Sequence, residues 1–328
     1  MRTLIIHNPK SGFGSDAIFQ FERALVRQGD ECTFRMLPDR FEAAEAIVGA
    51  GDYDLVVASG GDGTVSELLF ALRDVDVPVC VFPSGTANLL CANIGNAPEP
   101  QALARACRVG HTAAIDLGQM TWEDASGEQH SRGFAQMSGT GVDAQIMRAA
   151  IPNKAAMGQA AYYVAAMSAL HPTVARFRIT VDGEVHEREG ISCLVANNAM
   201  IQGDIEVIPD CRMDDGLIDV IVIETDRTAR LLRPLAFCLV DRSGQSIGRP
   251  YLESFRGRDV RVESSEPMPL EIDGEVVEGD FLWYEAHVVP GAVDVVVDTL
   301  SRYCTDDDPR PRYGGTEVVP YPQDAPHA

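Results

Sequence analysis

The sequence predicts a two-domain α/β fold, with an N-terminal doubly wound parallel sheet followed by a mostly antiparallel β-sandwich. Through the first part of the chain, short apolar runs alternate with segments of helical period, which is typical of a parallel sheet with covering helices. Later segments alternate apolar and polar residues and carry Asp-Gly pairs, which favours antiparallel hairpins. With 328 residues and 45% hydrophobic content, the chain is long enough to bury two cores.

The first domain is expected at residues 1–120. Its strands are predicted at residues 3–7, 32–37, 55–59 and 77–82, and its helices at 16–27, at 41–50 and directly after residue 64. The run from Leu55 to Ala58 is continuously apolar, as in a parallel strand that is covered on both faces. After the glycines that follow it, Val65, Leu68 and Leu72 repeat at helical spacing, so the periodicity changes from strand to helix there.

The second domain is expected at residues 121–300. Asp-Gly pairs at 182–183, 215–216 and 273–274 predict hairpin turns, and Phe177, Ile179 and Val181 alternate with polar residues before the first of them. One helix is predicted near residues 157–170, where apolar residues recur at helical spacing. Residues 301–328 are rich in proline and polar residues without a sustained period, so we expect a mobile tail.

Composition excludes several classes of function. The formal net charge of −22 argues against nucleic-acid binding and against broad electrostatic attachment to an anionic membrane. The eight cysteines and seven histidines are scattered without CxxC or HExxH patterns, so reduced thiols and no zinc site are expected. We see no secretory leader and no apolar stretch long enough to span a bilayer, which predicts a cytoplasmic protein. The sequence leaves open whether the chain forms a homodimer.

The most informative motif is the GGDGT turn at residues 60–64, between a predicted strand and a predicted helix. Glycine turns at helix starts bring backbone N–H groups close to an anion, so phosphate is the expected ligand. Two further glycine-bearing loops, NPKSGFG at 8–14 and PSGTAN at 83–88, also follow predicted strands. Ligands of parallel sheets bind at the carboxyl ends of strands, so the three loops are expected to form one site.

Other interpretations of these glycines are weaker. No GxxxxGK followed by Ser or Thr occurs, so a Walker-type P-loop is not expected. Gly12, Gly14 and Ala17 satisfy a GxGxxA dinucleotide fingerprint, but four residues separate Gly12 from the first strand. Thr64 and Glu67 also fit a capping box, which would give Glu67 a purely structural role.

Taken in order, the motifs resemble the diacylglycerol kinase catalytic domain family, which contains soluble bacterial lipid kinases and sphingosine kinase-like enzymes and is related in fold to NAD kinases. The resemblance covers nearly the whole chain. The matching segments are NPKSG at 8–12, GGDGTVSE at 60–67, PSGTANLLC at 83–91, AIDLG at 114–118, GTGVDA at 139–144, VANNAMIQGD at 195–204, IPDCRMDDGLIDV at 208–220 and EIDGE at 271–275.

The resemblance implies a set of ATP-binding residues in the three loops. They are Asn8, Pro9, Lys10, Ser11, Gly12, Gly61, Asp62, Gly63, Thr64, Val65, Ser66, Glu67 and Thr86. Backbone amides and hydroxyl groups of such loops can hold phosphates, while Asp62 could organise Mg²⁺ and its waters.

The resemblance also implies a magnesium site and a catalytic base in the second domain. A structural Mg²⁺ would bind Asp215 and the backbone carbonyls of Arg212 and Leu217, which are the oxygen ligands that this ion prefers. Glu275 would accept the proton of the acceptor hydroxyl, with Asp273 close by.

The implied activity is that of an ATP- and magnesium-dependent lipid kinase that contacts the membrane surface transiently, with diacylglycerol as the default acceptor. Sphingoid bases and NAD remain alternative acceptors. A non-catalytic nucleotide or lipid sensor is a further alternative. It is motivated by Phe13 and Leu89, which stand where many members of the family carry a basic and an acidic residue.

Overall fold

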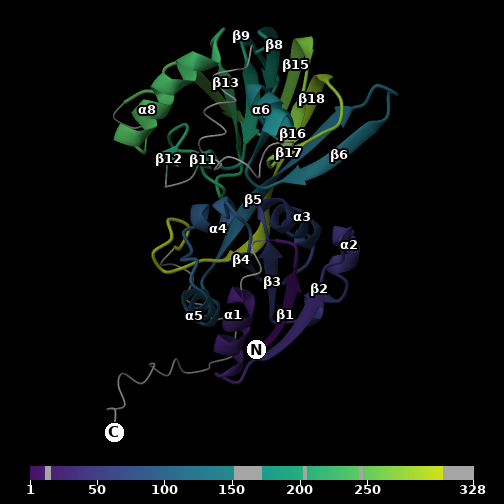
Figure 1. Cartoon of the computed structure of the whole chain (residues 1–328), viewed down its shortest axis with the longest axis vertical. Coiled ribbons are helices and arrows are strands. Elements are labelled where there is room, and N and C mark those ends of the chain that lie inside the picture. Colours follow the sequence, from purple (N-terminus) through teal and green to yellow (C-terminus); the bar gives the residue numbers. More distant parts are fainter. Residues whose placement is uncertain (12–15, 151–171, 202–204, 244–246, 306–328) are drawn as a thin grey trace.

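The computed structural model describes residues 1–11, 16–150, 172–201, 205–243 and 247–305. Figure 1 shows two halves, a parallel sheet with helices near the N-terminus and a β-rich half above it. The helix predicted at 157–170 and most of the predicted tail lie outside the described residues. Ser301 and Tyr303, at the start of that tail, are buried against the first half.

The first half is built on four parallel strands in the order β2 (Glu31–Met36), β1 (Arg2–His7), β3 (Leu55–Gly60), β4 (Val79–Pro83). Helices cover both faces: α1 (Ala17–Val26), α2 (Ala43–Ala46), α3 (Asp62–Leu72), α4 (Leu89–Asn93), α5 (Pro100–Val109) and the 3₁₀ turn η1 (Ala50–Asp52). The doubly wound fold is confirmed. The helix predicted at 41–50 was too long, since Gly49 adopts φ 73° and separates α2 from η1.

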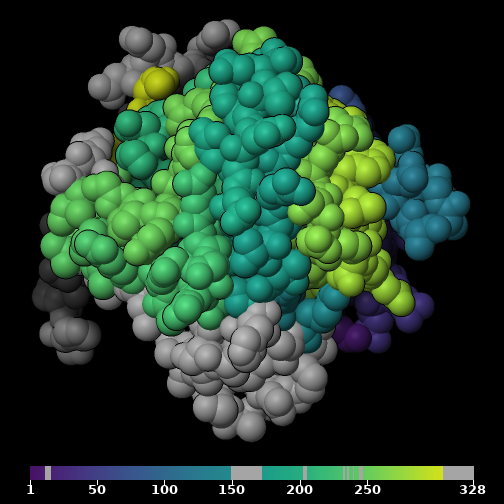
Figure 2. Space-filling view, turned by 90° about the horizontal axis from the view of Figure 1, so that it is seen from above, coloured from purple at the N-terminus to yellow at the C-terminus, as the bar shows by residue number. Residues whose placement is uncertain are grey.

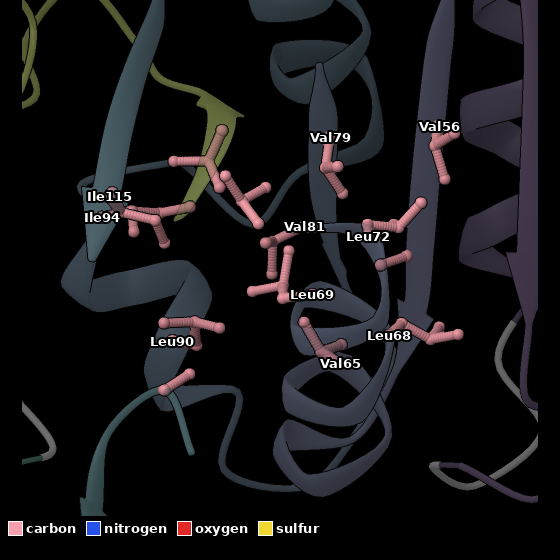
Figure 3. Packing of buried hydrophobic residues seen from close by; sticks show 14 of the residues in the cluster. Val56, Val65, Leu68, Leu69, Leu72, Val79, Val81, Leu90, Ile94 and Ile115 are labelled. Atoms are coloured by element: carbon pink, nitrogen blue, oxygen red, sulfur yellow. The ribbon is translucent and has the colours of Figure 1, made fainter. Parts of the chain in front are cut away.

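Alternating side chains of each strand divide the first core into two layers. Leu4 and Ile6 of β1 join one buried cluster, whereas Ile5 joins the cluster beneath α1 and α5. Figure 3 shows the first layer, where Val65, Leu68, Leu69 and Leu72 of α3 pack toward β3 and β4. This apolar face fixes α3 on the sheet, so its first turn lies at the carboxyl edge of β3.

Two long strands connect the halves. β5 (Thr112–Glu123) and β18 (Phe281–Val296) form an antiparallel ribbon, and Val295 of β18 also pairs in parallel with Val79 of β4. The register of the ribbon shifts between Val289 and Val293. One ten-stranded sheet therefore extends through both halves of the molecule.

The second half is a sandwich. The sheet that contains β5 and β18 continues into β6 (Gln129–Phe134), β15 (Asp259–Met268), β8 (Ala175–Val181) and β9 (Glu184–Gly190). The opposing antiparallel sheet has the order β14 (Leu252–Gly257), β13 (Ile218–Ile223), β10 (Ser192–Ala196), β7 (Met137–Gly141), β16 (Leu270–Ile272), β17 (Glu275–Val276). A shared buried cluster fills the space between the sheets, so the predicted β-sandwich is confirmed.

Smaller elements complete the second half: α6 (Val142–Ala150), β11 (Met200–Ile201), β12 (Ile205–Glu206), η2 (Thr228–Leu231) and α8 (Leu232–Val240). Figure 2, which views this half from above, shows the green segment with α8 to one side and the blue β5–β6 hairpin projecting on the other. Among the described residues, no helix combines the length and the apolar character that crossing a bilayer requires.

Two of the three predicted hairpins are confirmed. Asp182 and Asp273 adopt φ 48°, and each begins a two-residue turn between adjacent strands, β8–β9 and β16–β17. The hairpin predicted at 215–216 was wrong, because β13 pairs with β10 and β14 and with neither strand of the preceding segment. The N–H of Gly216 instead donates to the Asp116 carboxylate of β5.

Candidate active site

Residues 8–11 of the first glycine-bearing loop and the two other loops lie together at the carboxyl edge of neighbouring strands β1, β3 and β4, as the sequence predicted. Asn8 N–H donates to the Ser59 carbonyl at 2.8 Å, and Ser84 N–H donates to the Gly60 carbonyl at 3.1 Å. The Gly61 N–H donates to Ser11 Oγ at 3.0 Å. Each loop therefore contacts the central GGDGT turn.

The PSGTAN loop requires glycine at residue 85. A Cβ at Gly85 would lie 2.6 Å from the Gly61 Cα, so the second and third loops meet backbone to backbone. Helix α3 begins at Asp62, and no side chain caps its first turn from the N-cap residue Gly61. The first-turn N–H groups and the helix dipole make this position suitable for a phosphate group.

The capping box predicted for Thr64 and Glu67 was wrong, because the helix starts three residues earlier than that motif requires. Thr64 Oγ1 instead accepts a hydrogen bond from Asn8 Nδ2 at 2.9 Å. Glu67 is available to the second half of the molecule, where it pairs with Arg132.

A polar layer lies directly beneath the loops. His7 Nδ1 and Ser59 Oγ are 2.9 Å apart, and Ser59 Oγ and Ser84 Oγ are 2.8 Å apart. Burial lowers the pKa of His7, so its neutral form is favoured. Sequence reasoning did not identify this layer, since His7 and Ser59 lie outside the motifs and Ser84 was not singled out within its loop.

Asn88 and Asp62 order the third loop. Asn88 adopts φ 52°; its side chain accepts the Gly85 N–H at 2.7 Å and donates to the Gly85 carbonyl at 2.9 Å. Asp62 Oδ1 accepts the Leu90 N–H at 3.0 Å, which joins the starts of α3 and α4. An asparagine that ends a glycine-serine loop is a signal for such a left-handed turn.

The residues predicted to bind ATP differ in burial and in the contacts of their side chains. Val65 is 2% exposed and packs into the core, so only its backbone faces the loops. The Ser66 hydroxyl donates to Asp273 of the second half. Thr86 is exposed, and Gly12 lies outside the described residues.

The remaining loop residues lie at the surface. Pro9 and Lys10 are exposed, and Lys10 Nζ pairs with Asp39 at 2.8 Å. The Lys10 N–H donates to Asn8 Oδ1 at 3.0 Å, which closes a local turn. The Lys10 side chain is thus an exposed cation that pairs with Asp39.

Asp273 anchors the β16–β17 turn against both halves. Its carboxylate accepts the Ser66 hydroxyl, the Ala135 N–H at 2.7 Å and the Gln136 N–H at 3.0 Å. Burial raises the pKa of Asp273, and these hydrogen bonds oppose the rise. This turn is thereby held at the start of α3.

Glu275 follows on the same turn and reaches the GGDGT motif. Its Oε1 lies 2.8 Å from the position that a Cβ would take at Gly63. The side chain is 56% exposed, so it is open to a substrate while it touches the first turn of α3. The structure thus brings Glu275 and Gly63 together from distant parts of the sequence.

Arg132 of β6 joins the two predicted acidic residues. Its Nη2 lies 2.9 Å from Glu67 Oε1 and 2.6 Å from Glu275 Oε2. Burial and the Glu275 charge raise the pKa of Glu67, while Arg132 opposes the rise. Sequence reasoning missed Arg132, because a single arginine in an alternating strand gives no motif.

The predicted magnesium ligands lie in the loop before β13. Asp215 Oδ1 accepts the Leu217 N–H at 3.0 Å, and Asp215 Oδ2 lies 3.8 Å from Arg256 Nη1. The Arg212 side chain turns away to form a bidentate pair with Asp214 at 2.7 Å. Carboxylates and peptide groups therefore gather in this loop, and the donor set fits a hard cation.

Asp116, which is 2% exposed, organises that loop from β5. Its carboxylate accepts the Gly216 N–H at 2.6 Å and the Gly291 N–H at 2.7 Å. Burial raises the pKa of Asp116; the two N–H bonds oppose the rise, and the charges of Asp214 and Asp215 add to it. A cation in this loop would compensate that negative charge.

One cluster of three metal-ligating side chains occurs among the residues that the structure describes, at Asp124, Glu128 and His130 in the β5–β6 hairpin. Asp124 accepts the Ser126 and Glu128 N–H groups at 2.8 and 3.1 Å and pairs with His130 at 2.9 Å. These contacts account for the carboxylate as a turn residue.

Comparison with known proteins identifies relatives over most of the chain. Residues 2–120 match the diacylglycerol kinase catalytic domain, and residues 136–297 match the YegS C-terminal NAD kinase beta sandwich-like domain. The diacylglycerol kinase of Bacillus subtilis (strain 168) is 28% identical over 308 residues, which covers 88% of this chain and 96% of that protein. The diacylglycerol kinase of Staphylococcus carnosus (strain TM300) is 27% identical, with 88% and 94% coverage.

The crystal structure of a diacylglycerol kinase from Bacillus anthracis str. Sterne superposes with a TM-score of 0.69 at 20% sequence identity. The superposition covers 90% of this chain and 97% of that chain. Both halves described above are therefore arranged as in a solved structure.

Proposed function

The chain belongs to the diacylglycerol kinase catalytic domain family and is a lipid kinase, and from this premise we propose that it transfers the γ-phosphate of ATP to the hydroxyl of diacylglycerol, giving phosphatidic acid. The observation that carries the proposal is the approach of Glu275 to Gly63, which puts a carboxylate of the second half at the uncapped start of α3. The acceptor is presented by a membrane surface that the protein contacts transiently.

ATP binds, in this proposal, across the loops at the ends of β1, β3 and β4. The first-turn N–H groups of α3 and the hydroxyl of Ser11 face its phosphates, and Lys10 supplies a nearby positive charge. Mg²⁺ neutralises phosphate charge when bound with the nucleotide. These residues position the γ-phosphate, which is the main task of a protein in phosphoryl transfer.

Glu275 acts as the general base. It accepts the proton of the lipid hydroxyl while the hydroxyl oxygen forms a bond to the γ-phosphorus; the bond from that phosphorus to the bridging oxygen breaks, and ADP leaves. Asp273 is held by three donors and keeps the turn in place without taking that proton. In the loop before β13, Asp215 with the carbonyls of Arg212 and Leu217 would hold a structural Mg²⁺.

The test is turnover of radiolabelled ATP with the full chain and Mg²⁺, against vesicles that carry diacylglycerol or a sphingoid base, and against NAD in solution. We expect label in phosphatidic acid. Glu275→Gln is expected to lower kcat by about 10²–10⁴-fold, as for loss of a general base, while the Kd for ATP stays within a factor of about two.

Label in the sphingoid base or in NAD alone would replace diacylglycerol as the acceptor. A folded protein that labels none of the three, or a Glu275→Gln variant with wild-type turnover, would refute the proposed chemistry. A folded protein that labels none of the three acceptors would leave the sensor interpretation standing.

A further inference from the structure

We propose that Arg132 is a positioning residue of the kinase reaction, which holds Glu275 against α3 by sharing one guanidinium nitrogen between Glu275 and Glu67. The inference rests on the proposed role of Glu275 as the base. It adds a residue from β6 to a site otherwise formed by the glycine loops and the β16–β17 turn.

Strand β6 crosses close to helix α3. A Cβ at Gly133 would lie 2.1 Å from the Phe70 ring of α3, so only glycine allows β6 to cross the helix at this distance. The neighbouring residue Arg132 pairs with Met120 of β5 in the strand register. The backbone of β6 is thus fixed from both sides, and the Arg132 side chain reaches Glu67 of α3.

One guanidinium nitrogen of Arg132 contacts both acids. Arg132 Nη2 contacts Glu67 Oε1 at 2.9 Å and Glu275 Oε2 at 2.6 Å. Arg132 is 26% exposed, whereas Glu275 is 56% exposed. The better shielded cation therefore orients the more mobile acid, because a charge-assisted hydrogen bond limits the rotamers of a long side chain.

Charged groups surround Glu275 on several elements. Glu67 faces it from α3 and Asp273 lies on its own turn, while Arg132 faces it from β6. On β16, Glu271 accepts the Gly274 N–H at 2.7 Å. From α6, which packs against β17, Asp143 is directed to Ser192 and Arg148 to Asp280.

Among the described residues, Arg132 is thus the cation that contacts Glu275 directly, with Glu67 and Asp273 nearby. Removal of Arg132 leaves Glu275 beside Glu67 without compensation. A protonated Glu275 cannot accept the hydroxyl proton, so turnover falls first at low pH.

The experiment measures kcat, KM for ATP and Tm between pH 5 and 9 for the full chain with diacylglycerol vesicles. For Arg132→Gln, the acidic limb of the kcat profile is expected to move up, because Glu275 then faces Glu67 without the guanidinium. The kcat plateau falls about tenfold as Glu275 loses its orientation. KM for ATP stays unchanged.

Two further variants separate charge from packing. Glu67→Gln removes the competing acid and frees the guanidinium for Glu275, so its acidic limb moves down. Arg132→Lys keeps a cation and restores the wild-type limb. If the pair had a purely structural role, Glu67→Gln and Arg132→Gln would move the acidic limb of the kcat profile in the same direction.

The matched control is Arg188→Gln on β9. Arg188 is 30% exposed and lies between Glu224, at 3.3 Å, and Glu253, so it has the same local arrangement away from the glycine loops. Its substitution is expected to leave the pH profile unchanged.

An unmoved acidic limb or a higher kcat in Arg132→Gln would overturn the inference, since the contact would then be neutral or inhibitory. If that variant does not fold, absence of a downward movement in Glu67→Gln overturns it. Failure of the proposed function is distinct: wild-type turnover in Glu275→Gln, or no lipid labelling by the wild type, overturns both.

Discussion

Gly63 and Glu275 lie close together in the candidate site. The Glu275 carboxylate limits the space beside Gly63, because a methyl group added to Gly63 would lie 2.8 Å from Glu275 Oε1. Gly63 lies within α3, where alanine is a good helix former. The backbone therefore does not require glycine here, in contrast to a glycine in a strained turn.

Substitution of Gly63 by alanine is therefore expected to preserve or raise Tm and to lower kcat. The methyl group displaces Glu275 by a fraction of an ångström to one ångström, which costs about 10–10²-fold in turnover when a reacting group is misplaced. The measurement is steady-state kcat together with thermal unfolding.

Gly248→Ala serves as the control for that prediction, since no atom lies within 4 Å of its Cβ position. Its kcat is expected to equal that of the wild type. A Gly63→Ala enzyme of full activity would show that Glu275 does not need its observed position.

At the residue scale, the sequence was informative where a backbone requirement restricts residue choice. Glycines at 60 and 85 and the asparagine at 88 are such positions, and the resemblance of their loops to a known family named the acids across the site. Arg132, Ser59 and His7 act through tertiary contacts between strands distant in sequence. Nothing local to them distinguishes them from ordinary strand residues.

At the scale of elements, β16 and α6 carry a pair of buried acids behind the catalytic turn. Glu271 is 3% exposed and shares a side-chain hydrogen bond with Asp143, which also accepts the Ser192 hydroxyl at 3.0 Å. Burial, and then the Asp143 charge, raise the pKa of Glu271 well above its ordinary value. Glu271 therefore holds a proton in the folded protein that the unfolded chain releases.

The sign of the pH dependence follows from that proton. Since the folded state binds more protons, its contribution to stability is complete below the ordinary glutamate pKa of 4.5 and is lost as the pH rises through the raised value. Glu271→Gln imitates the protonated acid and is expected to raise Tm by about 2–4 °C at pH 8.

At pH 5 the two proteins are expected to melt together, because Glu271 is protonated in the wild type there. Scanning calorimetry across this range is the measurement. A constant difference in Tm at all pH values would assign the effect to packing and would contradict a buried, shared proton.

Elements with strong periodicity were predicted well, and those set by long-range contacts were not. Apolar periodicity predicted β1, β3 and α3, because each of these elements has a continuous buried face. The loop at 215–216 has hairpin residues, yet Asp116, a hundred positions earlier, determines its path. No local pattern can report such a partner.

At the scale of the whole molecule, the β5–β18 ribbon makes the two halves interdependent. Val293, Val295, Val297 and Tyr303 are at most 4% exposed and belong to the first core, although they follow the second half in sequence. Each such valine contributes about 1.5–3 kcal/mol on burial, so three approach the whole stability of a typical domain, about 5–15 kcal/mol.

A chain that ends at residue 292 is therefore expected to lose cooperative unfolding in both halves, whereas a chain that ends at residue 305 retains every described contact and the wild-type Tm. Circular dichroism melts of the two truncations give the comparison. An intact melting transition in the shorter chain would show that the first half closes its core without β18.

The pairing of β18 with β4 also determines when folding can finish during protein synthesis. β4 presents an apolar edge, from Val79 to Phe82, and its partner strand leaves the ribosome only after nearly the whole chain has been made. During that interval the nascent N-terminal sheet has an unpaired edge strand, which is a template for aggregation. Ribosome speed and chaperone supply, rather than final stability, are thus expected to limit the yield of this kinase.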